Sequence, residues 1–170
     1  KDTLALIKTG EDNEVPMQVV RSVIKSNENR KFAMANKIID ACGGTIEGKK
    51  IAVLGLTFKA NTDDIRDAPS LCIIPELLKA GAKINVYDPE GMNEAKTHFG
   101  ETLKYCNNAI EATNNVDTIV VLTEWQEFID MTFDFCKSQI KFPNIIDLRN
   151  CLDWDKLTKN GLEKIFRFGN

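Results

Sequence analysis

The sequence predicts an α/β protein in which a doubly wound, mostly parallel sheet is preceded by one long helix. Short apolar segments alternate with helical segments at spacings of roughly 10–15 residues, which favours right-handed strand–helix–strand crossovers. The run at 50–55 is continuously apolar, as is typical of a strand that helices cover on both faces. Before that strand, apolar residues recur at mixed three- and four-residue steps over a long stretch, which indicates a helix.

The first part of the chain predicts two helices. One pattern begins at Asp2 and breaks at 10–15, and Pro16 then suits the first turn of a new helix. The second pattern continues to Cys42, where Gly43-Gly44 ends it. A helix of roughly 26 residues is about 40 Å long, which is more than a compact domain needs for packing.

The middle of this long helix, 25–31, is polar on every face. We therefore expect its two apolar ends to pack against different partners, as in a helix that connects two domains or forms a subunit interface. An ordinary surface helix with a kink near 26–29 is the alternative.

The remaining elements follow in order along the chain. Strands are predicted at 50–55, 83–87, 102–105, 118–122, 144–147 and 164–168. Helices are predicted at 69–80, 92–99, 109–113, 128–140 and 153–159.

Composition narrows the classes of partner. The net charge of −3, the pI near 5.3 and the lack of a Lys/Arg-rich block argue against nucleic-acid binding. No apolar run approaches the ~18 residues needed to cross a bilayer and no signal-peptide layout is present, so we expect a cytoplasmic protein without membrane contact. Five cysteines without CxxC spacing favour reduced thiols over disulfides or a metal site. The only histidine, His98, is expected at an exposed helix end.

Polar loops follow three of the predicted strands. In a doubly wound sheet the first and fourth strands are neighbours, so the loops after them face one crevice. Lys59 and Arg66 follow the first strand, Glu124 follows the fourth, and Arg149 follows the fifth. Three cations that converge there would suit a diphosphate. The alternative is a solvated connection in which Lys59 pairs with Asp63 and Arg66 pairs with Asp64.

The first of these loops is not a dinucleotide fingerprint. Gly55 is followed by Leu-Thr-Phe-Lys, without the second and third glycines, and no GK[ST] of a P-loop follows. Trp125 could pack on a base or sugar, although a core position is favoured. Asp88 stands where a ribose-binding carboxylate would lie, but Pro89 and Gly91 equally suit a turn, which we favour.

The motifs in these loops resemble those of a known family. Residues 55–70, GLTFKANTDDIRDAPS, are similar to the signature loop of the nucleotide-sugar 6-dehydrogenases, in the form closest to the UDP-glucose 6-dehydrogenases. The resemblance continues at 86–89 (VYDP), 122–125 (LTEW) and 146–150 (IDLRN) and covers nearly the whole chain.

The resemblance implies a division of the chain and a chemistry. Members of this family have an N-terminal Rossmann domain for NAD, a central helix with the dimer contact, and a C-terminal Rossmann-like domain for UDP. Residues 1–44 would be the helical dimerisation segment, with a homodimer formed through 16–42, and 45–170 the UDP-binding domain. The family oxidises UDP-glucose to UDP-glucuronate, a precursor for polysaccharide biosynthesis, in two hydride transfers to NAD through a cysteine adduct.

The resemblance also implies roles for single residues. Lys1-Asp2 resemble the end of the segment that carries the catalytic cysteine, so this chain alone is expected to be inactive. Asp2 would be the catalytic aspartate, a role compatible with a helix N-cap. Lys59 and Arg149 would bind the UDP-sugar, and Arg66 would reach the NAD pyrophosphate.

Two alternatives remain open at this point. The chain would be a fragment of a UDP-N-acetylmannosamine or GDP-mannose dehydrogenase, or a stand-alone nucleotide-binding module without catalysis.

Overall fold

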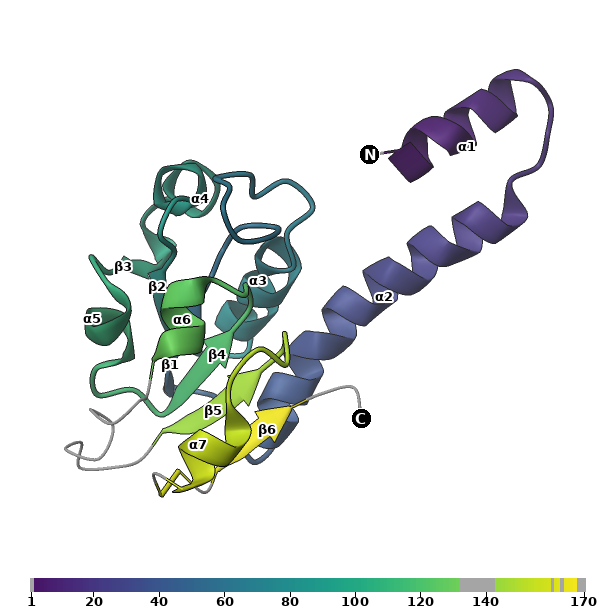
Figure 1. Ribbon diagram of the computed structural model, residues 1–170. Helices are drawn as coiled ribbons and strands as arrows, with labels where there is room; N and C mark the ends of the chain where they lie inside the picture. The colour runs from purple at the N-terminus through teal and green to yellow at the C-terminus, as the bar shows by residue number, and fades with distance from the viewer. Residues whose placement is uncertain (1, 132–142, 160, 163, 168–170) are drawn as a thin grey trace.

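A parallel sheet with helices on both faces forms the body of the molecule, and two helices extend from it (Figure 1). The computed structural model describes residues 2–131, 143–159, 161–162 and 164–167. The strands are β1 (Lys50–Leu54), β2 (Lys83–Tyr87), β3 (Lys104–Tyr105), β4 (Thr118–Val121), β5 (Asn144–Asp147) and β6 (Ile165–Arg167). The helices are α1 (Asp2–Asp12), α2 (Gln18–Ala41), α3 (Ser70–Lys79), α4 (Met92–Phe99), α5 (Ala109–Thr113), α6 (Gln126–Asp130) and α7 (Trp154–Lys159), with a 3₁₀ turn, η1 (Gly100–Thr102).

The strand order is β3-β2-β1-β4-β5-β6, and the paired strands of the described sheet run parallel. This confirms the predicted doubly wound α/β fold and the neighbouring positions of β1 and β4. The register pairs Leu54 with both Tyr87 and Val121, so β1, β2 and β4 end at the same edge of the sheet. The loops that follow them therefore start side by side.

Strand β1 lies between two hydrophobic cores because its side chains alternate between the two faces of the sheet. Ile51 and Val53 face the core that α2, α3 and α4 cover, whereas Ala52 and Leu54 face the core of α5, α6 and α7. The four side chains are fully buried, which explains the continuous apolar run.

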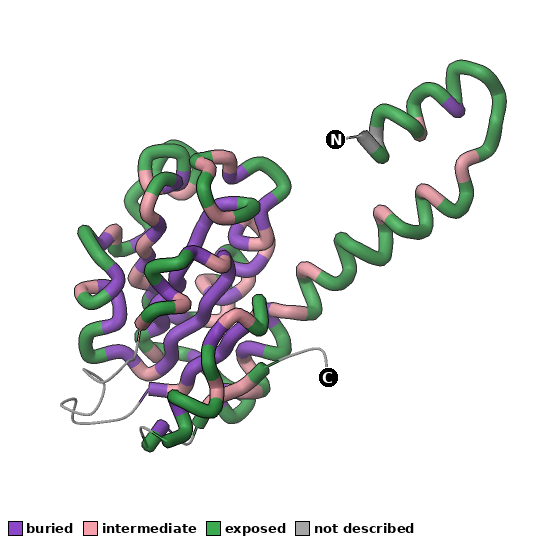
Figure 2. The backbone as a smooth tube through the Cα atoms, in the orientation of Figure 1, coloured by how far each residue is buried: buried purple, intermediate pink, exposed green. Residues whose placement is uncertain are grey.

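Helix α2 is anchored at one end only. Ile38 and Cys42, near its C-terminus, are buried in the first core. The helix ends where Gly43 and Gly44 adopt φ values of +90° and +84°, and the Gly44 N–H donates to the Ile39 carbonyl. Most of the remaining helix is exposed (Figure 2).

The predicted elements match these closely, with small differences. Helix α2 begins at Gln18, after Pro16, rather than with proline in its first turn. Strand β3 is shorter than 102–105 because 100–102 forms η1. The predicted helix 128–140 begins earlier, at Gln126, and α6 already ends at Asp130, because Met131 has an extended backbone conformation. Residues 132–140 of the predicted helix and Phe168 of the last strand lie outside the described residues. No helix among the described residues is long and apolar enough to cross a membrane.

Candidate functional site

The loops after β1 and β4 touch each other at the carboxyl edge of the sheet. Gly55 has a φ of +92°, and a Cβ atom at this position would lie 2.6 Å from the backbone nitrogen of Thr123. The Thr123 hydroxyl also donates to the Thr57 carbonyl at 2.8 Å. Only a glycine allows this approach, so the two loops are held in fixed relation.

Asp88, at the end of β2, ties a third loop to these two. Its fully buried carboxylate accepts hydrogen bonds from the N–H groups of Leu56 and Thr57, at 2.6 and 3.2 Å, and from the indole N–H of Trp125 at 3.2 Å. It also accepts the N–H of Gly91 at 2.7 Å, as in the turn that the sequence favoured. Sequence reasoning missed these contacts between loops, because two of the donors are backbone N–H groups, which every residue type except proline has, and because the partner of the Trp125 indole depends on the fold.

Trp125 occupies a core position rather than an open ligand face. Its side chain is buried in the second core, and its N–H is used by Asp88. The core interpretation of this residue is therefore correct.

The two cations of the β1–α3 loop behave differently. The Arg66 guanidinium is exposed and binds both carboxylate oxygens of Asp64, at 2.8 and 2.6 Å. The Asp64 hydrogen bond raises the pKa of Arg66. Lys59 is exposed and makes no ion pair with Asp63, although both residues are described. The pairing alternative thus holds for Arg66 but not for Lys59.

Arg149 follows β5 and is oriented from two directions. Its backbone N–H donates to the buried carboxylate of Asp147 at 2.9 Å, which fixes the start of the loop. Its side-chain Nε donates to Glu124 at 2.6 Å and joins this loop to the one after β4. Burial opposes ionisation of Glu124, but the hydrogen bond and charge of Arg149 hold the pKa of this carboxyl below its ordinary value.

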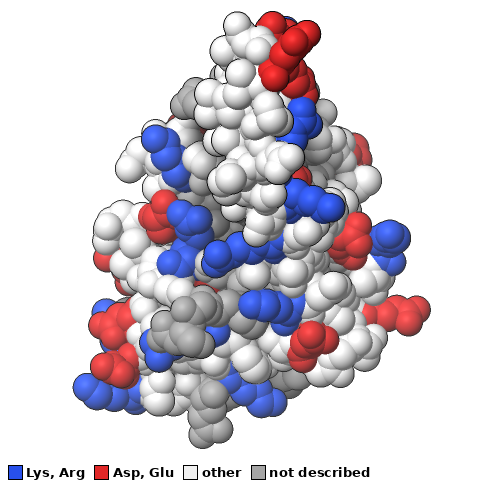
Figure 3. Space-filling model, turned by 90° about the vertical axis from the view of Figure 1, so that its right-hand side faces the viewer, with Lys and Arg blue, Asp and Glu red and all other residues white. Residues whose placement is uncertain are grey.

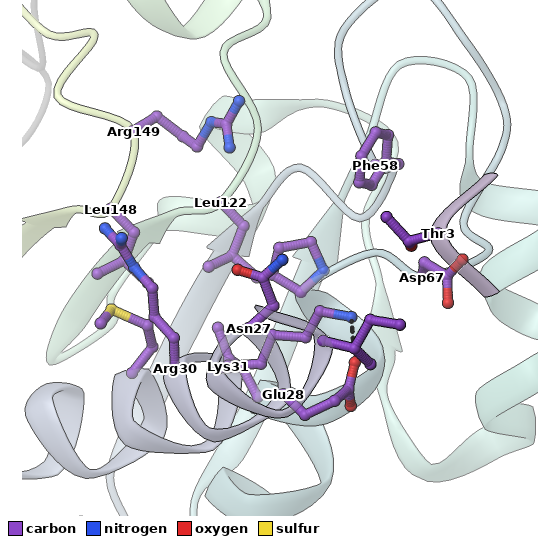
Figure 4. A pocket seen from close by; sticks show the side chains of 14 residues that line it. Thr3, Asn27, Glu28, Arg30, Lys31, Phe58, Asp67, Leu122, Leu148 and Arg149 are labelled. Carbon is purple, nitrogen blue, oxygen red and sulfur yellow. Dashed lines mark hydrogen bonds and ion pairs between the residues drawn. The ribbon is translucent and has the colours of Figure 1, made fainter. Parts of the chain in front are cut away.

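A cavity of about 510 Å³ lies between these loops and the middle of α2 (Figure 4). Arg149 enters it from one end, and Phe58, Asp67 and Thr3 of α1 lie at the other. Leu122 and Leu148 supply apolar wall. Helix α2 contributes a set of polar side chains, namely Asn27, Glu28, Arg30 and Lys31.

The cavity differs from the predicted site in its cations. We expected Lys59, Arg66 and Arg149 to converge on one ligand. In the structure Arg149 lines the cavity, whereas Lys59 and Arg66 do not. The Arg66 guanidinium pairs with Asp64, and Lys59 is exposed to solvent. Arg30 and Lys31 take their place.

Sequence reasoning missed this contribution of α2. By itself the polar stretch 25–31 indicates only that the two apolar ends of the helix are separated. The available signal was the run of polar residues inside an otherwise amphipathic helix, because such a turn is not expected to pack against an apolar core.

Asp2, the remaining predicted site residue, is the first residue of α1, and its side chain is not among those described. Its neighbour Thr3 lines the cavity, so this end of α1 lies beside the site.

Comparison with known proteins identifies close relatives. Residues 52–154 match the model of the UDP-glucose/GDP-mannose dehydrogenase family, UDP binding domain. The chain is 47% identical over 161 residues to a UDP-glucose 6-dehydrogenase of Rhizobium meliloti, and 39% identical over 162 residues to one of Rickettsia conorii. Each alignment covers 95% of this chain but only 37% and 38% of the relative. The chain thus spans little more than a third of the length of these curated relatives.

A solved structure shows the same fold. The UDP-glucose dehydrogenase of Pyrobaculum islandicum aligns with a TM-score of 0.75 and 25% identity, over 99% of this chain and 35% of that one.

Proposed function

The chain belongs to the UDP-glucose/GDP-mannose dehydrogenase family, and on that premise we propose that the cavity beside Arg149 binds the UDP part of a UDP-sugar. The position of the cavity carries this proposal. It lies at the carboxyl ends of β1, β4 and β5, at the point where the strand order reverses, which is where open α/β sheets bind ligands. Arg149 offers a planar cation to an anionic group, and the apolar wall offers a surface to a base or sugar.

We further propose that the whole protein is an NAD-dependent UDP-glucose 6-dehydrogenase of the cytoplasm that supplies UDP-glucuronate for polysaccharide biosynthesis. The names of the relatives and the signature loop at 55–70 support this. In this role Arg149 binds the UDP-sugar inside the cavity, and Lys59, which is exposed beside the lining residue Phe58, reaches the same ligand from outside the lining. Asp2 acts as the catalytic aspartate beside the sugar end of the cavity, where Thr3 lies.

The NAD cofactor does not fit the β1–α3 loop of this sheet. A pyrophosphate in a dinucleotide fold needs free N–H groups in the loop after the first strand, but those of Leu56 and Thr57 are bound to the buried carboxylate of Asp88. We propose that NAD is held by another domain, and that Arg66, exposed at the edge of this one, reaches the cofactor pyrophosphate after leaving Asp64.

Three of the four described cysteines have pKa shifts opposite to the one a nucleophile needs, and the fourth, Cys42, is buried. Burial raises the pKa of Cys72 and Cys106, and burial together with Asp147 raises the pKa of Cys151 to about 12. A catalytic cysteine needs the opposite shift, because the thiolate is the reactive form. Cys136 lies outside the described residues. We therefore propose that these 170 residues alone do not oxidise UDP-glucose.

We propose a homodimer formed through α2, in keeping with a division into a helical segment, 1–44, and a UDP-binding domain, 45–170. Val19 and Val23 lie one helical turn apart and are 77% and 49% exposed, and Val15 just before the helix is 52% exposed. A run of exposed aliphatic side chains on a projecting helix is typical of an interface. Val19→Glu should convert the dimer to a monomer in analytical ultracentrifugation, and an unchanged sedimentation coefficient would contradict this interface.

Isothermal titration of this chain with UDP tests the proposed binding. Wild type should bind UDP more tightly than GDP, and Arg149→Ala should weaken UDP binding about tenfold or more, since a hydrogen bond to a charged group is worth roughly 1.5–3 kcal/mol. Lys79→Ala removes an exposed cation away from the cavity and should change nothing. A wild type that prefers GDP, or an Arg149→Ala variant that binds UDP normally, would contradict the proposal.

Absorbance of NADH provides the activity test. Addition of UDP-glucose and NAD to this chain should produce no signal. Sustained NADH production by these residues alone would overturn the assignment of the chemistry to another part of the protein.

A further inference from the structure

Arg30 is a cation of the cavity that the proposed function has not used. It comes from the middle of α2 and lines the cavity together with Lys31 of the same helix and Arg149 of the loop after β5. The guanidinium stays charged at every physiological pH. Whatever occupies the cavity therefore meets this charge.

The other two cations of the cavity already have carboxylate partners. Lys31 pairs with Glu28 at 3.3 Å, and Arg149 pairs with Glu124 at 2.6 Å. Arg30 makes no ion pair among the residues that the structure describes. Its positive charge is thus left for a ligand.

The arrangement of the side chains brings Arg30 to the Arg149 side of the cavity. Figure 4 shows Arg30 rising from α2 toward Leu148, on the side where Arg149 enters, whereas Phe58, Thr3 and Asp67 lie at the opposite side. Figure 3 shows Lys and Arg side chains gathered in the middle of the face that carries α2, with most Asp and Glu side chains around them. An anion that approaches this face is attracted toward its centre.

We propose that Arg30 binds the diphosphate of the nucleotide sugar together with Arg149, so that the long helix contributes directly to substrate binding. This inference rests on the proposed function, because it assigns a further residue to the same site. Two guanidinium groups on one side of a cavity suit two linked phosphates, since each offers a planar fork to phosphate oxygens. The sugar would then extend toward Thr3 and the start of α1.

Calorimetric titration of this chain with uridine, UMP and UDP tests the role of Arg30. Arg30→Ala should weaken UDP binding about tenfold or more, weaken UMP binding less, and leave uridine binding unchanged, because only the phosphates meet the guanidinium. Arg30→Lys keeps the charge but loses the fork, so its affinity for UDP should lie between the two. Alanine, lysine and arginine have similar helix propensities, so α2 should persist in each variant, as circular dichroism can verify.

Lys25→Ala is the matched control, because it removes an exposed cation of the same helix that does not line the cavity. It should leave the affinity for UDP unchanged. A wild type that fails to bind UDP would contradict the proposed function itself. A wild type that binds UDP beside an Arg30→Ala variant of equal affinity would overturn the role of Arg30 alone. Equal losses for uridine and UDP would also overturn it, since they would reflect a change of shape rather than a lost anion contact.

Discussion

At the scale of single residues, Gly55 sets the distance between the loops after β1 and β4. Any side chain there would combine a φ of +92° with a contact of 2.5–2.6 Å to Thr123. The backbone conformation alone costs about 1–3 kcal/mol for a non-glycine residue, and overpacking costs about 1–3 kcal/mol more. Gly55→Ala should therefore lower the free energy of unfolding by about 2–6 kcal/mol in urea denaturation.

Gly43 offers a matched control for that variant. Its φ is +90°, but a Cβ atom there meets nothing within 4 Å. Gly43→Ala should show only the conformational part of the loss. Equal losses in the two variants would mean that the contact with Thr123 is not the cause.

Asp88 is a second residue with effects beyond its own loop. Asp88→Asn places an amide among donors that now point at a carboxylate, namely the N–H groups of Leu56, Thr57 and Trp125. Leaving one such donor unsatisfied costs about 1–3 kcal/mol. We expect a loss of at least this size in thermal unfolding, with a change in tryptophan fluorescence because the indole N–H loses its acceptor. Asp63→Asn, at an exposed position of the neighbouring loop, should leave both signals unchanged.

The pair of Glu124 and Arg149 predicts a response to acid. The pKa of Glu124 is lowered from 4.5 in the folded protein, so the pair stabilises the fold above that ordinary value. Its contribution is lost as the pH falls through the folded pKa. Because the Glu124 side chain is 34% exposed, the contribution is below about 1 kcal/mol.

Glu124→Gln should therefore be slightly less stable than wild type at neutral pH. The two proteins should become equal once the pH has fallen below the lowered pKa of Glu124 in the folded protein, as urea denaturation at a series of pH values can measure. A difference that persists unchanged into strong acid would show that the ion pair is not its origin.

At the scale of elements, α2 joins surfaces of different kinds. Ile38 is fully buried against the core of the sheet, whereas Val19 of the same helix is 77% exposed. Ile38→Ala removes core volume and should cost about 2–5 kcal/mol of unfolding free energy. Val19→Ala should cost less than about 1 kcal/mol at protein concentrations where the chain is monomeric. Similar losses at both positions would contradict the one-sided anchoring of the helix.

The helices and strands were predictable where one local rule dominated. The apolar run at 50–55 predicts a buried strand, and Gly43-Gly44 predicts the end of a helix. The structure confirms both predictions. The role of the polar turn around Arg30 was not predictable, because it depends on how α2 crosses the sheet. The direction of Arg66 was likewise left open, since both Asp64 and a ligand suit a guanidinium.

At the scale of the whole molecule, ligand binding and folding are linked. The cavity is bounded by α1, α2 and loops from both halves of the sheet, so an unfolded chain has no equivalent site. UDP at about 100 times its dissociation constant should add about 2.7 kcal/mol of stability. Differential scanning calorimetry should show this as a rise in melting temperature for wild type, and as a rise of about half that size or less for Arg149→Ala, since tenfold weaker binding leaves only about 1.4 kcal/mol at the same UDP concentration. Equal rises in both would show that the nucleotide binds elsewhere.

The topology was predictable at this scale, whereas the assembly of the site was not. The alternation of strands and helices predicted a doubly wound sheet with β1 beside β4, and the structure confirms this pairing. The three loops that meet at Asp88 are joined mainly through backbone N–H groups, which every non-proline residue possesses. Their contacts therefore leave little trace in residue types.

The contacts of Asp88 and Gly55 have a consequence for protein engineering. A chimera that exchanges only the β1–α3 loop for that of a relative leaves the β2 and β4 loops shaped for the original. Grafting that aims at a new sugar nucleotide must transplant these segments together, as a single cassette. The loops after β1, β2 and β4 must therefore be exchanged together.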